Sequence, residues 1–264
     1  MNLLIVGTIS QDFINFVSNS KLLDKIFVTE SSLNVDVPNI EYSSKEELLK
    51  KIKALQIDIV IIFNKNFVRI GMVDYLKSNF INVISVNQKW FNLEDSRLVA
   101  KRLLGYYKIN IPKIILAPTE FPLVLKSDLQ GLRKVITSLD ELIQYTQKYV
   151  GQKTFLEEFL SGDCYKLLSL WDGVSGYHFE DNSTFTEVQK ERLELLKVKL
   201  NIMFSEEKAN FLGFYSTEII WTKNDWYVLN IEMTLDEELI LAYIKKDFLY
   251  ILYLMVYQKI NELK

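Results

Sequence analysis

Short apolar runs alternate with amphipathic segments over the first ninety residues of the chain. The runs have the length of β-strands, and the segments between them repeat their apolar residues at the spacing of an α-helix. This alternation is typical of a parallel sheet wrapped by helices. Strands are predicted at residues 3–6, 25–28, 58–63 and 82–85, with helices through 14–17, 44–54 and 68–78.

Two of these elements carry further signals. Ser43 and Ser44 precede Lys45-Glu-Glu47, so a serine oxygen can accept from the free amides of a helix that runs to Ala54, and the glutamates suit its positive end. The run Asp58-Ile-Val-Ile-Ile-Phe63 is continuous in isoleucine and valine. It predicts a central strand that is buried on both faces.

After residue 90 the regular alternation is lost. A helix is expected to end before Ile111-Pro112, because proline disfavours a helical residue before it. A turn over 222–225 joins two apolar segments and predicts a hairpin. We predict helices at 93–107, 139–149, 187–203 and from 238, strands at 122–126, 132–136, 154–159, 211–221 and 226–232, and a loop at 173–183. This part is therefore of the α+β type.

The composition excludes several classes of protein. The chain has 264 residues, 49% of them hydrophobic, which is enough for one large domain or two to three packed lobes. Its net charge of -3 gives no basic surplus for nucleic acid. The apolar run from Asp247 to Tyr257 is about half the length that crosses a bilayer, so we expect a buried helix and no membrane partner. A single cysteine and an opening strand in place of a signal peptide predict a cytoplasmic setting.

Local motifs then point to a family. Leu3-Leu-Ile-Val-Gly7, Asp95-Ser-Arg-Leu-Val-Ala-Lys101, Pro122-Leu-Val-Leu-Lys126 and Glu157-Glu-Phe-Leu-Ser-Gly162 follow one another along the chain. The series resembles the ATP-grasp ligases, and among them the phosphoribosylamine–glycine ligase type of purine biosynthesis. The resemblance implies an α/β fold with a Rossmann-like lobe at 1–112, a small ATP-grasp lobe at 113–175 and a large ATP-grasp lobe at 176–264. The family's C-terminal domain is expected to be absent.

The resemblance also implies a site for ATP and magnesium. Lys126 and Arg97 would meet the phosphates, with Lys101 one turn after Arg97. Residues Glu157, Glu158, Phe159 and Leu160 would form the adenine hinge, and Asp163 would meet the ribose. Glu218 and Glu232 would bind Mg²⁺, an ion that prefers oxygen ligands. Thr234 stands where the family has a metal-binding asparagine.

Other segments depart from the family. Its glycine-rich phosphate loop is replaced by Ser127-Asp-Leu-Gln-Gly-Leu-Arg-Lys134, and a long substrate segment is reduced to about six residues between Tyr177 and Thr184. Few glycines leave few backbone amides that can approach phosphate. Two functions stay open: an ATP-dependent carboxylate–amine ligase that uses an acyl phosphate, and a non-catalytic nucleotide-binding or scaffold protein, a pseudoenzyme. The site chemistry favours the second.

Each candidate residue also has an ordinary structural interpretation. Lys126, Arg97 and Lys101 are compatible with solvent-exposed positions, and Glu218 and Glu232 with the outer face of a hairpin. Cys164 is expected to be a small buried hydrophobe, and His178 to lie on the surface. The partner is a nucleotide or another small molecule. The aromatic residues of the final helix favour either core packing or a homodimer surface.

Overall fold

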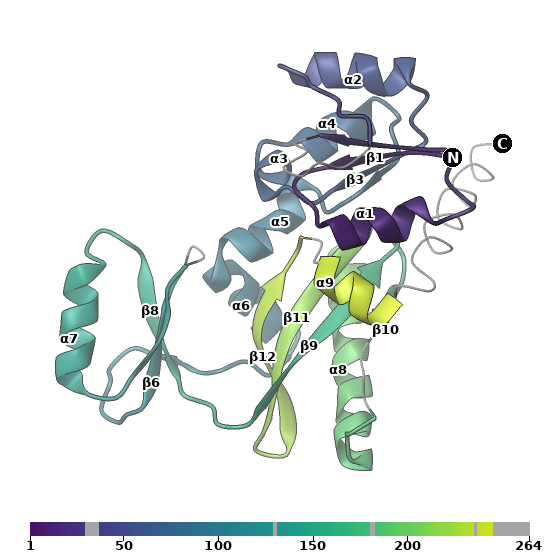
Figure 1. Cartoon of the computed structure of the whole chain (residues 1–264). Coiled ribbons are helices and arrows are strands. Elements are labelled where there is room, and N and C mark those ends of the chain that lie inside the picture. Colours follow the sequence, from purple (N-terminus) through teal and green to yellow (C-terminus); the bar gives the residue numbers. More distant parts are fainter. Residues whose placement is uncertain (30–36, 129–130, 180–182, 235–236, 245–264) are drawn as a thin grey trace.

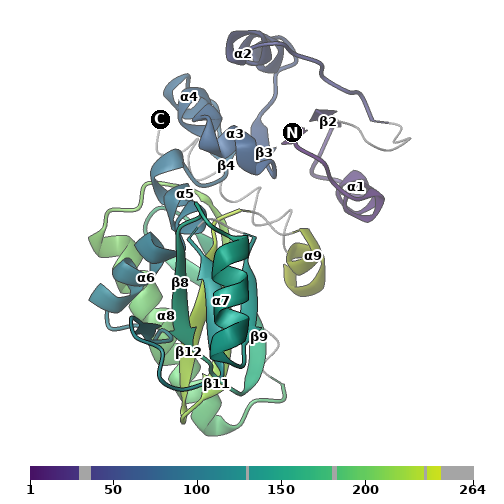
Figure 2. The same ribbon diagram turned by 90° about the vertical axis from the view of Figure 1, so that its left-hand side faces the viewer.

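The computed structural model describes residues 1–29, 37–128, 131–179, 183–234 and 237–244. These residues form three four-stranded sheets. Figure 1 shows an N-terminal sheet lying above two further sheets, one of them with helix α7 and the other with helix α8. Figure 2 shows the same arrangement from the side, with the N-terminal sheet and its helices forming the upper part of the molecule.

The N-terminal sheet has the order β2-β1-β3-β4, and all its strands are parallel. Its elements are β1 (Asn2–Val6), α1 (Gln11–Ser18), β2 (Lys25–Thr29), α2 (Lys45–Ala54), β3 (Ile59–Ile62), α3 (Lys65–Arg69), α4 (Met72–Ser78) and β4 (Val83–Ile84). Every residue of β3 is buried, which confirms the predicted central strand. Ser44 accepts from the Glu47 amide, which confirms the predicted helix cap.

Helices cover both faces of this sheet. Leu3 and Ile5 belong to the apolar cluster around α1, whereas Leu4 and Val6 belong to the cluster that includes α2 and α4. Successive residues of a strand point to opposite faces, so this division follows directly from the continuous apolar sequence.

Two predicted helices are each divided in two. Gly71 has a φ of 74° and separates α3 from α4, because a left-handed residue interrupts the helix. Ser96 is extended and separates α5 (Gln88–Asp95) from α6 (Arg97–Tyr106). Its side chain accepts from the Val99 amide, so it begins a new helix in place of continuing the first.

The small sheet has the order β5-β8-β6-β7 and is antiparallel. It consists of β5 (Ile114–Ile115), β6 (Leu123–Ser127), β7 (Arg133–Ile136) and β8 (Thr154–Glu158), with α7 (Leu139–Lys148) between the last two. Leu125, Leu132, Ile136 and Leu142 form a separate apolar cluster between the sheet and α7. The small sheet therefore has a core of its own.

The large sheet has the order β10-β9-β11-β12 and is also antiparallel. Its elements are β9 (Asp163–Trp171), β10 (Gly176–Phe179), α8 (Glu187–Glu206), β11 (Gly213–Thr222) and β12 (Asp225–Glu232). The predicted hairpin is confirmed as β11 and β12. The predicted loop over 173–183 was wrong in part, since it contains β10, and β9 was missed because the polar residues at its start are mostly exposed.

Aromatic packing joins the large sheet to the N-terminal part of the chain. Trp90 of α5 and Phe204 of α8 have ring centroids 5.1 Å apart, and Phe204 lies 5.4 Å from Trp171 of β9. Leu168 and Leu170 on the other face of β9 join the cluster around α1. The two sheets therefore share continuous apolar cores.

The described chain ends in a short helical segment, α9 (Glu237–Leu239) followed by the π-helix η1 (Ile240–Ile244). The rest of the predicted final helix, from residue 245, lies outside the described residues. Within the described part of the chain, no helix combines the length and hydrophobicity needed to cross a membrane.

Candidate functional site

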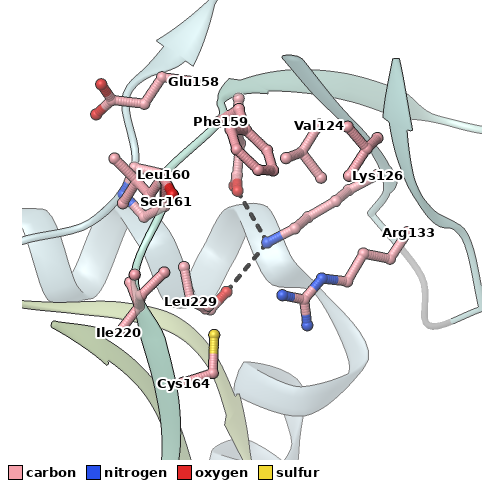
Figure 3. A pocket seen from close by; sticks show the side chains of 14 residues that line it. Val124, Lys126, Arg133, Glu158, Phe159, Leu160, Ser161, Cys164, Ile220 and Leu229 are labelled. Carbon is pink, nitrogen blue, oxygen red and sulfur yellow. Dashed lines mark hydrogen bonds and ion pairs between the residues drawn. The ribbon is translucent and has the colours of Figure 1, made fainter. Parts of the chain in front are cut away.

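A cleft of about 260 Å³ lies between the small and the large sheet (Figure 3). The small sheet contributes Val124, Lys126, Arg133 and Val135, and the large sheet contributes Cys164, Ile220 and Leu229. The end of β8 and its connection to β9, together residues 157–162, cross between the two sheets and form one wall. The predicted strand lysine and the predicted adenine hinge therefore line one cavity.

Three buried charges meet at the floor of this cleft: Lys126 and Glu157 line it, and Lys101 of α6 contacts Glu157. Glu157 lies opposite Val124 in the strand register, which puts its side chain on the same face as that of Lys126. Its carboxylate is 2.8 Å from Lys126 Nζ and 2.6 Å from Lys101 Nζ. None of the three side chains is more than 4% exposed. Lys101 and Lys126 are thus held by one shared counter-ion, and neither is a solvent-exposed lysine.

Burial is the main influence on both lysines. It lowers the pKa of Lys126 to about 8, while Glu157 acts in the opposite direction. Burial also lowers the pKa of Lys101, and again Glu157 opposes the shift. Lys126 Nζ donates a further hydrogen bond of 3.2 Å to the Leu229 carbonyl of β12. The lysine of the small sheet therefore reaches the large sheet across the cleft (Figure 3).

The hinge between the sheets offers backbone groups and apolar side chains. Leu160, Ile220 and Leu229 form a small apolar cluster at the wall of the cleft. The Glu158 side chain points away from it (Figure 3), where it accepts from the Lys113 amide and pairs with Lys223 at 2.8 Å. This wall fits the flat apolar face of an aromatic ring better than a charged group.

Gly162 fixes the position of the hinge. A Cβ atom at this residue would lie 2.1 Å from the Trp221 carbonyl oxygen, so the two backbones approach more closely than any side chain permits. The glycine of the Glu-Glu-Phe-Leu-Ser-Gly motif is therefore required by contact with β11.

The two ends of the connection from β6 to β7 are hydrogen-bonded to each other. Ser127 exchanges hydrogen bonds with Leu132, and the Arg97 guanidinium donates to the carbonyls of both residues at 3.2 and 2.9 Å. Asp128 accepts from the Leu98 amide and from Ser96, and so holds the start of α6. Burial lowers the pKa of Arg97. The structure thus places Arg97, predicted as a phosphate contact, as a brace of this turn.

The two predicted metal ligands lie diagonally on one face of the β11–β12 hairpin. Glu218 is opposite Asn230, and Glu232 is opposite Ser216. Glu218 is 2.6 Å from Arg133, while Glu232 is 3.7 Å from Lys166 and accepts from Ser216 at 3.3 Å. Each carboxylate therefore has a cationic side chain beside it.

Glu94 of α5 contacts the two residues that follow β12. Its buried carboxylate accepts from the Met233 amide at 2.8 Å and from the Thr234 hydroxyl at 3.0 Å. Lys65 lies 2.6 Å from its other oxygen. The hydroxyl that stands where the family has an asparagine is thus directed at a carboxylate.

Two further residues from the sequence analysis, Asp163 and Cys164, lie at the start of β9. Asp163 is exposed at the start of β9, opposite Trp221, and its ribose contact stays a prediction. Cys164 is exposed and lines the cleft, so the expectation of a buried hydrophobe was wrong. Partial desolvation at the wall of the cleft raises the pKa of its thiol.

His178, expected on the surface, is partly exposed and lies within a polar network. Its Nδ1 is 2.8 Å from Ser169 Oγ, and its Nε2 is 3.2 Å from Asn201 Oδ1 of α8. Burial lowers the pKa of His178 to about 4, so the imidazole is neutral at pH 7. Its partners hold it between β9 and α8, away from the cleft.

The structural importance of Glu157, Arg133 and Lys166 was not predicted from the sequence. Glu157 was assigned to the adenine hinge, yet its carboxylate joins two lysines. One signal was present: Lys126 and Glu157 both stand on apolar strands, where a buried charge requires a partner.

Comparison with other proteins supports the fold. Neither the protein-family models nor the curated proteins include a match to this sequence. Among solved structures, phosphoribosylamine–glycine ligase from Thermotoga maritima superposes with a TM-score of 0.74 and 17% identity, over 94% of this chain and 73% of that one. N5-carboxyaminoimidazole ribonucleotide synthetase from the same organism superposes with a TM-score of 0.62 and 15% identity, over 88% of this chain and 68% of that one. The biotin carboxylase complex from Campylobacter jejuni gives 0.68 and 12%, over 89% and 66%. The chain has the fold of the ATP-grasp ligases.

Proposed function

We propose that the cleft between the small and the large sheet binds a purine nucleotide, and that the chain is a nucleotide-binding protein with an ATP-grasp fold. The observation that carries the proposal is Lys126, a buried lysine whose ammonium group reaches the cleft beside an apolar wall. A buried cation next to a flat apolar cavity suits a ligand that combines an aromatic base with phosphates.

The charges of the floor agree with this ligand. Lys101 and Lys126 share a single carboxylate, so one positive charge is left in a buried setting. A phosphate group would neutralise that charge. The solved structures of similar fold include D-alanine–D-alanine ligase from Bacillus anthracis complexed with ATP and an ADP complex of N5-carboxyaminoimidazole ribonucleotide synthetase, with TM-scores of 0.54 and 0.67.

The same geometry disfavours efficient ligation. The turn after β6 is closed by Ser127 and Leu132, and Arg97 is engaged in bracing it. Acyl-phosphate chemistry requires positioned phosphates, metals and a second substrate, and most of the rate enhancement comes from that positioning. We therefore propose binding without efficient turnover.

Ligation of the phosphoribosylamine–glycine ligase type is the second candidate. It is favoured by the superposition over 94% of the chain. Phosphate release from ATP in the presence of phosphoribosylamine and glycine tests it directly. Release above the rate without the amine and acid would establish turnover, together with magnesium as its cofactor if chelation stops it.

The experiment for nucleotide binding is thermal melting with ATP, ADP or no ligand. A ligand that binds only the folded state must raise the midpoint. Lys126→Met should remove most of the shift, whereas Lys50→Met, an equal loss of charge on exposed α2, should leave it intact. Circular dichroism confirms that both variants fold. The absence of a shift in the unsubstituted protein at millimolar nucleotide would overturn the proposal.

A further inference from the structure

We propose that nucleotide binding in this cleft does not require a divalent cation, because Arg133 provides the positive charge that metal ions provide in other proteins of this fold. This inference rests on the proposed function and adds that the nucleotide binds in its metal-free form. It concerns the open end of the cleft, where β7 faces the hairpin of the large sheet.

Arg133 stands where a metal would otherwise be expected. Its Nη1 lies 2.6 Å from Glu218 Oε1, so the guanidinium spans from the small sheet to the large one. Figure 3 shows the group pointing into the cleft on the same side as the Lys126 ammonium group. A ligand phosphate that reaches Lys126 would therefore meet Arg133 next.

The residues present do not fit a magnesium ion well. Mg²⁺ requires near-octahedral coordination by oxygen atoms. Glu218 is engaged by Arg133, Glu232 has Lys166 and Ser216 beside it, and the Thr234 hydroxyl donates to Glu94. Within the described residues, no group of three or more histidine, cysteine, aspartate or glutamate side chains could hold a metal ion.

A guanidinium is well suited to this role. It presents five N–H donors in a planar fork, which matches two oxygens of a phosphate, and it stays charged at any physiological pH. Arg133 is 46% exposed, so ligand can reach its remaining N–H groups while Nη1 stays on Glu218. The carboxylate then orients the guanidinium toward the phosphate.

The test is equilibrium dialysis of the full chain with ATP, once in EDTA and once in millimolar Mg²⁺. We expect affinity in EDTA at least equal to that in Mg²⁺. Arg133→Met should weaken binding in EDTA by about tenfold, the value of one charge-assisted hydrogen bond, and should make binding depend on Mg²⁺ because Glu218 is released. Lys134→Met, the same charge change on the next residue of β7, should behave like the unsubstituted protein.

The outcomes separate this inference from the proposed function. Binding in Mg²⁺ that is lost in EDTA overturns the inference and leaves the nucleotide site standing. An Arg133→Met variant that binds ATP in EDTA as well as Lys134→Met does also overturns it. No binding under either condition overturns both proposals. The exposed Arg133–Glu218 pair adds little to stability, so the variant is expected to fold, and its melting curve confirms this.

Discussion

The two ends of the cleft hold ion pairs of similar length in very different surroundings. At the deep end, Glu157 lies 2.6 Å from Lys101, and neither side chain is more than 4% exposed. At the open end, Glu218 lies 2.6 Å from Arg133, but the arginine is 46% exposed and the glutamate 23%. Distance therefore does not distinguish these pairs, whereas burial does.

The difference determines what each end can do. Removing one partner of a buried pair leaves a charge in a medium that solvates it poorly, whereas an exposed pair exchanges its partner for water at little cost. The deep end is thus part of the folded core. At the open end, the exposed N–H groups of Arg133 can bind a ligand while its pair with Glu218 is kept.

The largest expected effect comes from breaking the deep end. Glu157→Gln keeps the shape of the side chain but leaves Lys101 and Lys126 without their shared counter-ion. We expect a loss of about 3–5 kcal/mol in the free energy of unfolding, measured by urea denaturation at pH 7. Glu158→Gln, which removes only the partly exposed pair with Lys223, should cost less than about 1 kcal/mol. Equal effects of the two substitutions would contradict the comparison.

His178 is a partly buried imidazole that lies outside the cleft. Desolvation lowers its pKa to about 4 in the folded state, from about 6.5 for a free histidine. The unfolded chain therefore takes up a proton at higher pH than the folded chain does. The stability that this group provides is complete above pH 6.5, and up to about 3 kcal/mol is lost as the pH falls to 4.

The measurement is urea denaturation at several pH values. His178 is the single histidine of the chain, so titration between pH 6.5 and 5 is attributable to it. The variant His178→Gln should lose the pH dependence in that interval. A slope that persists in the variant would assign it to carboxylates instead.

Titration of Lys126 tests the deep end in its role toward ligand. Burial lowers its pKa to about 8, so the side chain is a charged ammonium group at pH 7 and loses its proton as the pH rises past 8. Nucleotide affinity should fall by about tenfold above that pH, because one charge-assisted hydrogen bond disappears. Isothermal titration calorimetry from pH 7 to 9.5 measures this fall. The Lys126→Arg variant should show no such decline, and a parallel decline in both proteins would exclude Lys126 as its origin.

The smallest effect is expected at the open end. Glu218→Gln removes a pair that solvent reaches, so the free energy of unfolding should change by less than about 1 kcal/mol. The change should shrink further in 0.5 M NaCl, because salt screens exposed charges. A loss above 2 kcal/mol would show that the pair belongs to the core.

Local sequence signals predicted the regular part of the fold. The continuous run of β3 and the serine cap of α2 depend on nearby residues, and both are confirmed. The breaks at Gly71 and Ser96 were missed because apolar spacing continues through them. β10 was missed because four residues are too few for their alternation to stand out, and the strand is held by pairing with β9.

Less of the site than of the fold could be predicted from the sequence, because its charged residues meet across different sheets. The motif ending at Lys126 and the hinge at 157–162 indicated one cleft, and the structure brings them together. Sequence spacing does not reveal which charges meet across sheets, such as Arg133 and Glu218 from β7 and β11. The assignment of Arg97 to the ligand phosphates stays a prediction; in the structure its guanidinium Nη1 donates to two backbone carbonyls of its own chain.

The carboxylate of Glu94 links α5 to the chain that leaves β12, and it does so in a buried position. The N-terminal and large sheets are thereby held as one body. The contacts of Lys126 with Leu229 and of Arg133 with Glu218 both begin on the small sheet, which Asp128 fastens to α6 at one corner. Both contacts across the cleft therefore involve the small sheet, so a change in the width of the cleft would break or exchange them and leave the contacts between the N-terminal and large sheets in place.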